Sequence, residues 1–130
     1  MNNQVLLVEQ MQELIDMGID TSSASCIWWN FADLGFALMF LNDGRESLTI
    51  EKMKENHGAE NIVPAFTFQD ILEMLPDIGK EYANHPHVFK ASDGIHWYCS
   101  YGTMTCEIKG KTPLEAAFNM LKWVKQNNYI

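Results

Sequence analysis

The spacing of apolar residues predicts a helix near each end of the chain. Over residues 3–17, apolar side chains recur every three or four positions, which places them on one face of a helix. Gly18 then follows the pattern at the position of a helix C-cap. Near the other end, Thr112 and Pro113 are typical of a helix start, and an apolar stripe continues to about residue 126.

Two shorter helices are expected in the middle of the chain. Thr67 is a typical N-cap, and the helix that it starts should end before Pro76, because proline has no backbone N–H with which to continue the hydrogen-bond ladder. Residues 49–56 favour another helix, which Gly58 would end. An alternative remains for this segment, in which residues 47–51 extend the sheet.

Residues 26–31 and 35–41 are predicted to form two strands that are apolar on both faces. Side chains alternate between the faces of a strand. One face therefore carries Phe36, Leu38 and Phe40, and the other carries Ala37, Met39 and Leu41. The adjacent Trp28 and Trp29 also point to opposite faces. An antiparallel hairpin usually leaves one face in solvent, so either two layers cover this hairpin or one face is an apolar interface.

Three further strands are expected to form a sheet with one buried and one solvated face. A loop at residues 92–94 would pair Phe89 with Trp97, and a turn at residues 101–102 would pair Trp97 with Cys106. The predicted core face holds Phe89, Ala91, Ile95, Trp97, Cys99, Met104, Cys106 and Ile108. The predicted solvated face holds Lys90, His96, Tyr98, Ser100, Thr103, Thr105 and Glu107.

These elements predict a single α+β domain over residues 1–130, with a curved antiparallel β-sheet and helices packed on one face. The order from residue 67 to residue 126 is α-β-β-β-α. This order resembles double-stranded RNA-binding domains and some toxin and antitoxin domains. Residues 110–117, Gly-Lys-Thr-Pro-Leu-Glu-Ala-Ala, are similar to the Gly-x-Thr-x-x-Glu-Ala helix start of HicB-type antitoxins. That motif consists mostly of capping chemistry and does not assign a function.

The net charge of −8 argues against nucleic acid as a partner. Residues 1–44 carry six acidic side chains and neither lysine nor arginine, and Arg45 is the only arginine of the chain. Nucleic-acid binding depends on neutralising phosphates and uses arginine to read bases. An alternative with nucleic acid remains at the C-terminal end through Lys109, Lys111, Lys122 and Lys125.

Cysteine usage and hydropathy predict a cytoplasmic protein. The three cysteines, Cys26, Cys99 and Cys106, are odd in number and contain no Cys-x-x-Cys pair, which is typical of reduced thiols in the core. Residues 1–10 show no secretory signal, and no apolar run reaches the roughly 18 residues of a membrane span. We therefore expect no membrane as a partner.

The solvated face of the second sheet offers one candidate ligand site. The predicted register places His96 opposite Glu107, with Lys90 beside His96 and Tyr98 in the next row. A row of titratable groups on a rigid sheet suits binding or acid–base chemistry. Cross-strand pairs also stabilise ordinary exposed sheets by about 0.2–1 kcal/mol each, and this structural role is the favoured interpretation.

A metal site is conceivable but not expected. His87 would lie near Cys99 and Cys106 on the core face, whereas a metal needs three or four converging ligands and these two thiols are only diagonal to each other. We expect buried thiols, no metal and no cofactor. No phosphate loop, dinucleotide fingerprint or nucleophile motif is present, so the sequence favours a protein that is not an enzyme.

Two segments resemble a group of uncharacterised small proteins associated with phages and mobile elements of gut anaerobic bacteria. They are Val-Pro-Ala-Phe-Thr-Phe-Gln-Asp-Ile-Leu at residues 63–72 and Glu-Ala-Ala-Phe-Asn-Met-Leu-Lys-Trp at residues 115–123. The resemblance covers roughly the C-terminal half. It implies a phage-derived or accessory context, in which small proteins bind and modulate host machinery.

Together these patterns favour a non-enzymatic protein-binding domain that associates with itself as a homodimer. Exposed apolar aromatics and methionines are typical of interfaces. Two candidate interfaces are the N-terminal hairpin, with Trp28, Trp29, Phe36 and Phe40, and a row of the last helix, with Met120 and Trp123. The acidic N-terminal third would also favour basic partner surfaces. The patterns do not identify a protein partner.

Overall fold

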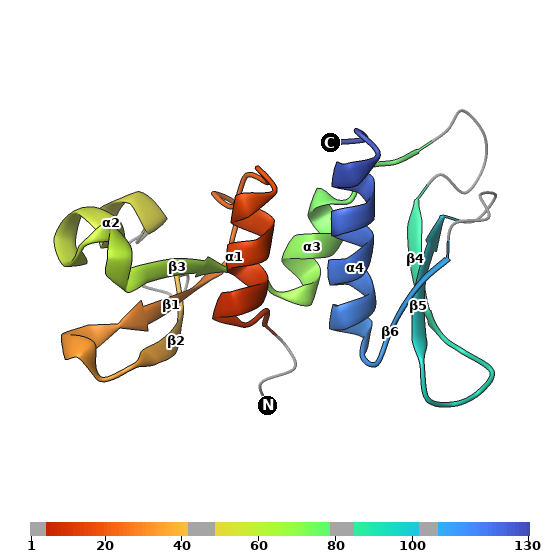
Figure 1. Cartoon of the computed structure of the whole chain (residues 1–130), viewed down its shortest axis with the longest axis horizontal. Coiled ribbons are helices and arrows are strands. Elements are labelled where there is room, and N and C mark those ends of the chain that lie inside the picture. The colour runs from red at the N-terminus through yellow and green to blue at the C-terminus, as the bar shows by residue number, and fades with distance from the viewer. Residues whose placement is uncertain (1–4, 42–48, 79–84, 102–106) are drawn as a thin grey trace. The chain divides into compact units, whose positions relative to one another are not determined.

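The computed structural model describes residues 5–41, 49–78, 85–101 and 107–130 and shows an α+β fold. Four α-helices and two three-stranded antiparallel sheets lie in the described part of the chain (Figure 1). The chain divides into two compact units, Val5–Thr67 and Phe68–Ile130. None of the described helices has the length and apolar character that crossing a membrane requires.

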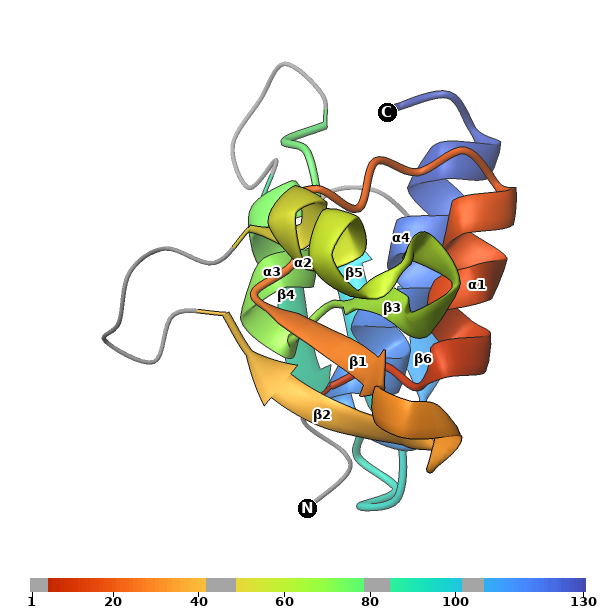
Figure 2. The same ribbon diagram turned by 90° about the vertical axis from the view of Figure 1, so that its left-hand side faces the viewer.

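The N-terminal unit is built around a sheet with the strand order β2-β1-β3. Its elements are α1 (Val8–Asp16), β1 (Cys26–Asn30), the short 3₁₀ helix η2 (Phe31–Asp33), β2 (Phe36–Phe40), α2 (Ile50–His57), the 3₁₀ helix η3 (Ala59–Asn61) and β3 (Ile62–Ala65). The two predicted strands are confirmed, and α2 settles the alternative for residues 49–56. The predicted first helix is confirmed only from Val8, because Val5 forms a bridge to Thr67 and the Leu6 N–H donates to the carbonyl of Phe66. Sequence analysis missed β3, which places β1 in the centre and β2 at an edge (Figure 2).

The central strand β1 is covered on both faces. On one face, the indole N–H of Trp28 donates to the carbonyl of Leu6, just before α1, at 2.8 Å. On the other face, the ring of Trp29 lies 4.6 Å from the ring of His57 at the end of α2. Neighbouring residues of a strand point to opposite faces, so each face of β1 has a packing partner, and the strand is buried at Cys26 and Ile27 and half-buried from Trp28 to Asn30. Cys26 accordingly lies fully buried.

A tight hairpin joins β1 to the edge strand β2. Ala32 and Asp33 both adopt positive φ angles, of 53° and 58°, and Gly35 follows with a φ of 98°. The side chain of Asn30 accepts a hydrogen bond from the Gly35 N–H at 3.0 Å. The hairpin thereby fixes the register in which Trp28 lies opposite Leu38.

The C-terminal unit has the predicted order α-β-β-β-α. Its elements are α3 (Phe68–Met74), β4 (Pro86–Lys90), β5 (Trp97–Tyr101), β6 (Glu107–Gly110) and α4 (Pro113–Gln126). The N-cap at Thr112 is confirmed, because its hydroxyl accepts from the Glu115 N–H at 3.0 Å. Helix α4 packs so closely on the sheet that a Cβ at Gly110 would collide with the backbone nitrogen of Ala116.

The registers predicted for the second sheet are wrong. Trp97 pairs with Lys90 and Gly110 instead of Phe89 and Cys106. The loop is longer than predicted, since the Ala91 N–H donates to the carbonyl of His96 at 2.8 Å and closes a loop over residues 91–96.

A one-residue shift moves side chains to the other face of a strand. Phe89 therefore leaves the core face and stacks on Tyr98 with 5.7 Å between ring centroids. Lys90 moves to the face of Trp97, and Ile95 is exposed in the loop. The predicted turn at residues 101–102 and the predicted pairing of Cys106 involve residues 102 and 106, which lie outside the described residues.

Candidate interaction site

The edge strand β2 exposes large apolar side chains. Phe36, Leu38 and Phe40 are 39, 37 and 52% exposed. They alternate along the strand, so they share the face on which Trp28 lies opposite Leu38. Sequence analysis predicted that this hairpin is apolar on both faces, and the structure shows that β1 is covered while β2 is not.

The same three residues direct their backbone groups away from β1. The Leu41 N–H donates to the Ser25 carbonyl at 3.0 Å, which makes Leu41 and Ser25 a hydrogen-bonded pair. In an antiparallel ladder such pairs alternate with pairs whose N–H and C=O groups point outward. The observed register therefore leaves Phe36, Leu38 and Phe40 with outward-pointing backbone groups.

The outer edge of β2 lacks the usual protection against pairing. Proteins commonly block an edge strand with lysine, proline, a bulge or a covering segment. The strand Phe36–Phe40 contains neither a charged residue nor a proline, and its ladder to β1 runs without a bulge. In the described part of the chain, no strand pairs with this edge.

The turn of the hairpin adds two exposed apolar side chains, of which Phe31 packs on Trp29 and so lies beside the sheet face opposite to that of Leu38. Leu34 is 85% exposed, and Phe31 is 61% exposed and packs edge-on against Trp29 at 5.2 Å. We call the set Phe31, Leu34, Phe36, Leu38 and Phe40 the apolar edge. From this set, the sequence pattern identified Phe36, Leu38 and Phe40 as one apolar face and assigned Phe36 and Phe40 to the predicted interface. Phe31 and Leu34 are large apolar residues at the turn of the predicted hairpin, and this pattern could have identified the tip as part of the apolar edge.

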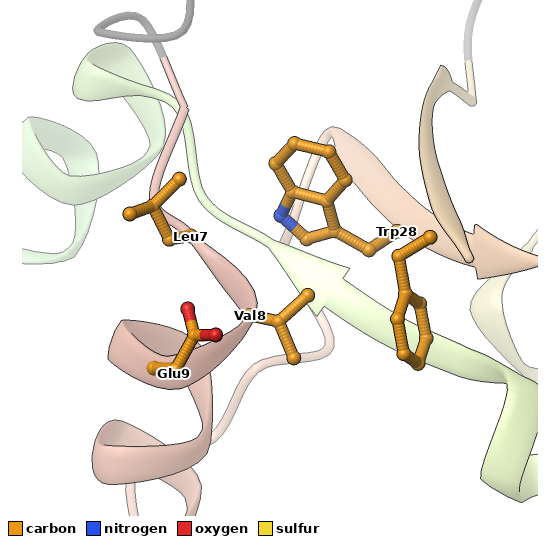
Figure 3. A pocket seen from close by; sticks show the side chains of 5 residues that line it. Leu7, Val8, Glu9 and Trp28 are labelled. Carbon is orange, nitrogen blue, oxygen red and sulfur yellow. The ribbon is translucent and has the colours of Figure 1, made fainter.

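A shallow pocket lies beside the apolar edge, between the start of α1 and the hairpin. Leu7, Val8, Glu9, Trp28 and Phe36 line a volume of about 310 Å³. Figure 3 shows Leu7, Val8, Glu9 and Trp28 around this space. The indole N–H of Trp28 is already bonded to Leu6, so the tryptophan offers the pocket an apolar ring. Glu9 contributes the carboxylate of the lining.

A second shallow hollow follows α1 from this pocket. Its lining comprises Val8, Glu9, Gln12, Glu13, Asp16 and Met17. The two hollows share Val8 and Glu9 in their linings, so they adjoin each other at these residues. Sequence analysis did not identify this site, because an acidic helix surface is the ordinary pattern of a solvated helix face.

The structure brings only one of the two predicted interfaces to the surface. Trp28 and Trp29 are half-buried in the hairpin beside the exposed Phe36. In α4, Met120 is fully buried, and Trp123 is half-buried and stacks on Tyr129 at 5.6 Å. The predicted row of α4 is therefore core packing at Met120 rather than an exposed interface.

The predicted ligand row around His96 is not assembled. His96 lies in the loop, where its Nδ1 is 2.7 Å from Asp93 Oδ2. Glu107 pairs with Ser100, and Lys90 lies on the other face from Tyr98. The backbone N–H and ring of His96, with the N–H of Ile95, hold the pKa of the Asp93 carboxyl below its usual range. These bonds shape the loop.

The conceivable metal cluster is not formed by the residues that the structure describes. His87 pairs with Ser100 and thus lies on the opposite face from Cys99, which is buried. Cys106 lies outside the described residues. Within the described ranges, no group of three metal-ligating side chains converges.

Two of the C-terminal lysines, Lys109 and Lys122, lie on different elements and do not share one surface. Lys109 pairs with Tyr98, on the sheet face opposite to the one where Gly110 meets α4. Lys122 lies on α4, and its ammonium is 4.4 Å from the centre of the Phe118 ring. A phosphate backbone would need these charges along one continuous track.

No protein-family model, curated protein or solved structure matches this chain. The function is therefore inferred from the geometry of its surface.

Proposed function

We propose that this protein is a non-catalytic protein-binding domain that associates with a second copy of itself through the apolar edge. The observation that carries the proposal is the coincidence of two features in β2. Phe36, Leu38 and Phe40 expose apolar side chains, and the same residues direct outward backbone groups that no strand of the described residues pairs with. Each feature alone favours association, and together they favour the addition of a strand.

The strand is complementary to itself. If two copies of β2 meet antiparallel with Leu38 opposite Leu38, Phe36 of each copy lies opposite Phe40 of the other. All three residues direct their backbone groups outward, so each of these pairs has the groups needed to exchange two hydrogen bonds. The exposed side chains of both copies then lie on one face of a six-stranded sheet.

The size of the edge indicates a reversible dimer. Stable interfaces bury about 1,200–2,000 Å² in total, whereas the element proposed to pair here is a strand of only five residues. We therefore expect a dissociation constant of roughly micromolar order. The predicted phage-derived or accessory context is compatible with such a small binding protein.

Sedimentation equilibrium tests the proposal with one matched pair of variants. Leu38→Lys places a charge in the centre of the apolar edge, whereas Ile95→Lys makes the same change at an exposed loop position of the other unit. We expect the wild type and Ile95→Lys to dimerise equally and Leu38→Lys to dimerise at least about tenfold more weakly, because the two lysines would lie directly opposite each other across the new strand pair and repel.

Circular dichroism and thermal unfolding of all three proteins check that each variant folds. A wild type that stays monomeric at the highest attainable concentration would contradict self-association. Equal dimerisation of a folded Leu38→Lys variant would move the interface away from β2.

A further inference from the structure

We propose that the pocket beside the hairpin and the acidic face of α1 bind a short extended segment of another protein. This segment carries a bulky apolar side chain and, about three residues away, a lysine or arginine. The site is distinct from the outer edge of β2, although Phe36 borders both.

The pocket is suited to an apolar side chain. Leu7, Val8, Trp28 and Phe36 form its walls, and Leu7 and Phe36 are 45 and 39% exposed without an occupant. The Trp28 N–H has its partner in Leu6, so a bound apolar group leaves no donor of the indole unsatisfied. The Leu7 N–H is likewise satisfied by Gln10 Oε1 at 2.9 Å, which fixes the helix start that forms one wall.

The charge around the pocket selects a cationic segment. Residues 5–67 contain ten acidic and three basic side chains, and none of the basic ones precedes Arg45. The N-terminal unit of a second copy would bring the same negative charge to this site. A segment with lysine or arginine has the complementary charge.

Helix α1 itself lacks a cation where one would stabilise it. The C-terminal end of a helix carries partial negative charge and favours lysine or arginine. The last turn of α1 has no basic residue and instead contains Asp16, whose carboxylate accepts only a neutral hydrogen bond from Gln12 in the described contacts, at 3.0 Å. A cation of the partner near Asp16 would offset both the carboxylate and the helix dipole.

The distance along α1 sets the spacing in the partner. Glu9 lines both the pocket and the second hollow, and Asp16 lines the second hollow seven residues further along α1. Seven residues of helix rise about 10 Å. A segment in the extended polyproline II conformation covers that distance in about three residues and returns its side chains to the same side every third residue. An apolar side chain in the pocket thus places a basic residue three positions away beside Asp16.

Fluorescence anisotropy with three labelled peptides tests the chemistry of the partner. The first is Gly-Ser-Phe-Ser-Gly-Arg-Ser-Gly, the second replaces Phe with Ser, and the third replaces Arg with Glu. We expect measurable binding of the first peptide at low ionic strength and at least about fivefold weaker binding of the other two. Equal binding of all three peptides, or binding of none, would overturn the proposal.

Matched variants of the full chain locate the site. Glu9→Gln and Leu7→Ser are expected to weaken binding of the first peptide about twofold to fivefold. Asp33→Asn and Leu34→Ser remove the same kinds of group from the exposed hairpin tip and should leave this binding unchanged. Circular dichroism confirms that each variant is folded.

Leu38→Lys separates this inference from the proposed self-association. It should weaken the dimer and retain the peptide. If Leu38→Lys abolishes peptide binding while Glu9→Gln and Leu7→Ser have no effect, the peptide adds to the strand edge and the pocket is not its site.

Discussion

At the scale of single residues, Gly110 lets helix α4 approach the sheet closely because it has no side chain. Gly110 ends β6 on the face that carries Trp97, and α4 passes so close that a Cβ there would meet the Ala116 backbone. The Asn119 side chain donates to the Lys109 carbonyl at 3.0 Å and holds the same contact. Close approach of two backbones therefore explains the glycine. Its φ angle is not among the positive values that favour glycine, so backbone conformation does not require it.

Gly110→Ala is expected to destabilise the protein. The added methyl group meets backbone atoms, which cannot rotate away as a flexible side chain can, so we expect a loss of about 1–3 kcal/mol in the free energy of unfolding. Urea denaturation followed by circular dichroism measures it. Lys111→Ala, at the exposed neighbouring position, is the control and should change the free energy by less than about 0.5 kcal/mol. Equal stability of Gly110→Ala and the wild type would contradict the close packing of α4.

At the scale of elements, the edge position of β2 decides that its apolar side chains and half of its backbone groups are exposed instead of buried. The strand Phe-Ala-Leu-Met-Phe would be suited to a sheet centre, yet β3 occupies the other side of β1 and leaves β2 at the edge. The ladder then divides its backbone groups into two sets. Met39 pairs with Ile27 through the inner set, whereas Leu38 belongs to the outer set.

Proline substitutions distinguish these two sets. Met39→Pro removes an N–H that bonds to β1 and leaves the carbonyl of Ile27 without its donor, so we expect it to destabilise the N-terminal unit by about 1–3 kcal/mol. Leu38→Pro removes an outward N–H and leaves the inner ladder bonds in place, so its folding cost should be smaller, while dimerisation weakens. Thermal unfolding and sedimentation of both variants measure the two effects. A larger folding cost for Leu38→Pro than for Met39→Pro would contradict the assigned ladder pattern.

At the scale of the whole molecule, charge acts in opposite directions on the two proposed interactions. Two N-terminal units that meet in a dimer both carry an excess of acidic residues, whereas β2 itself is uncharged. The pocket and α1, in contrast, are proposed to attract a positive segment. The same negative field thus opposes one association and supports the other.

Salt is therefore expected to affect the two interactions with opposite sign. Raising the ionic strength from low salt should strengthen dimerisation slightly, by screening repulsion, and should weaken binding of the Phe–Arg peptide. Sedimentation and anisotropy in the same salt series measure both. Parallel weakening of both with salt would show that the dimer rests on ion pairs and not on the apolar edge.

Much of the fold followed from local patterns. Apolar periodicity and capping residues located α1, α3 and α4, because these signals lie within a few residues of one another. The hairpin β1–β2 was also predicted. Strand β3 was missed, since Ile62–Ala65 is a four-residue segment that contains Pro64 and lacks clear alternation.

The candidate site could be predicted only in part. The sequence pointed to Phe36 and Phe40, because both faces of the hairpin were too apolar for one layer. The His96 row failed because Asp93 accepts from the backbone of His96 and lengthens the loop, and register shifts of even one residue exchange the faces of a strand. The pocket could not be predicted, because its lining combines Leu7 at the start of α1 with Trp28 and Phe36 of the hairpin, which lie far from Leu7 in the sequence.

The sequence by itself determined the α+β class, the acidic charge and the excess of apolar side chains in the N-terminal hairpin, because composition and short-range periodicity carry these properties. Only the tertiary structure decided which strand lies at the edge, which backbone groups point outward and which face of each strand is buried. Those features depend on pairings between distant segments, such as β1 with β3, and no local pattern encodes the partner of a strand.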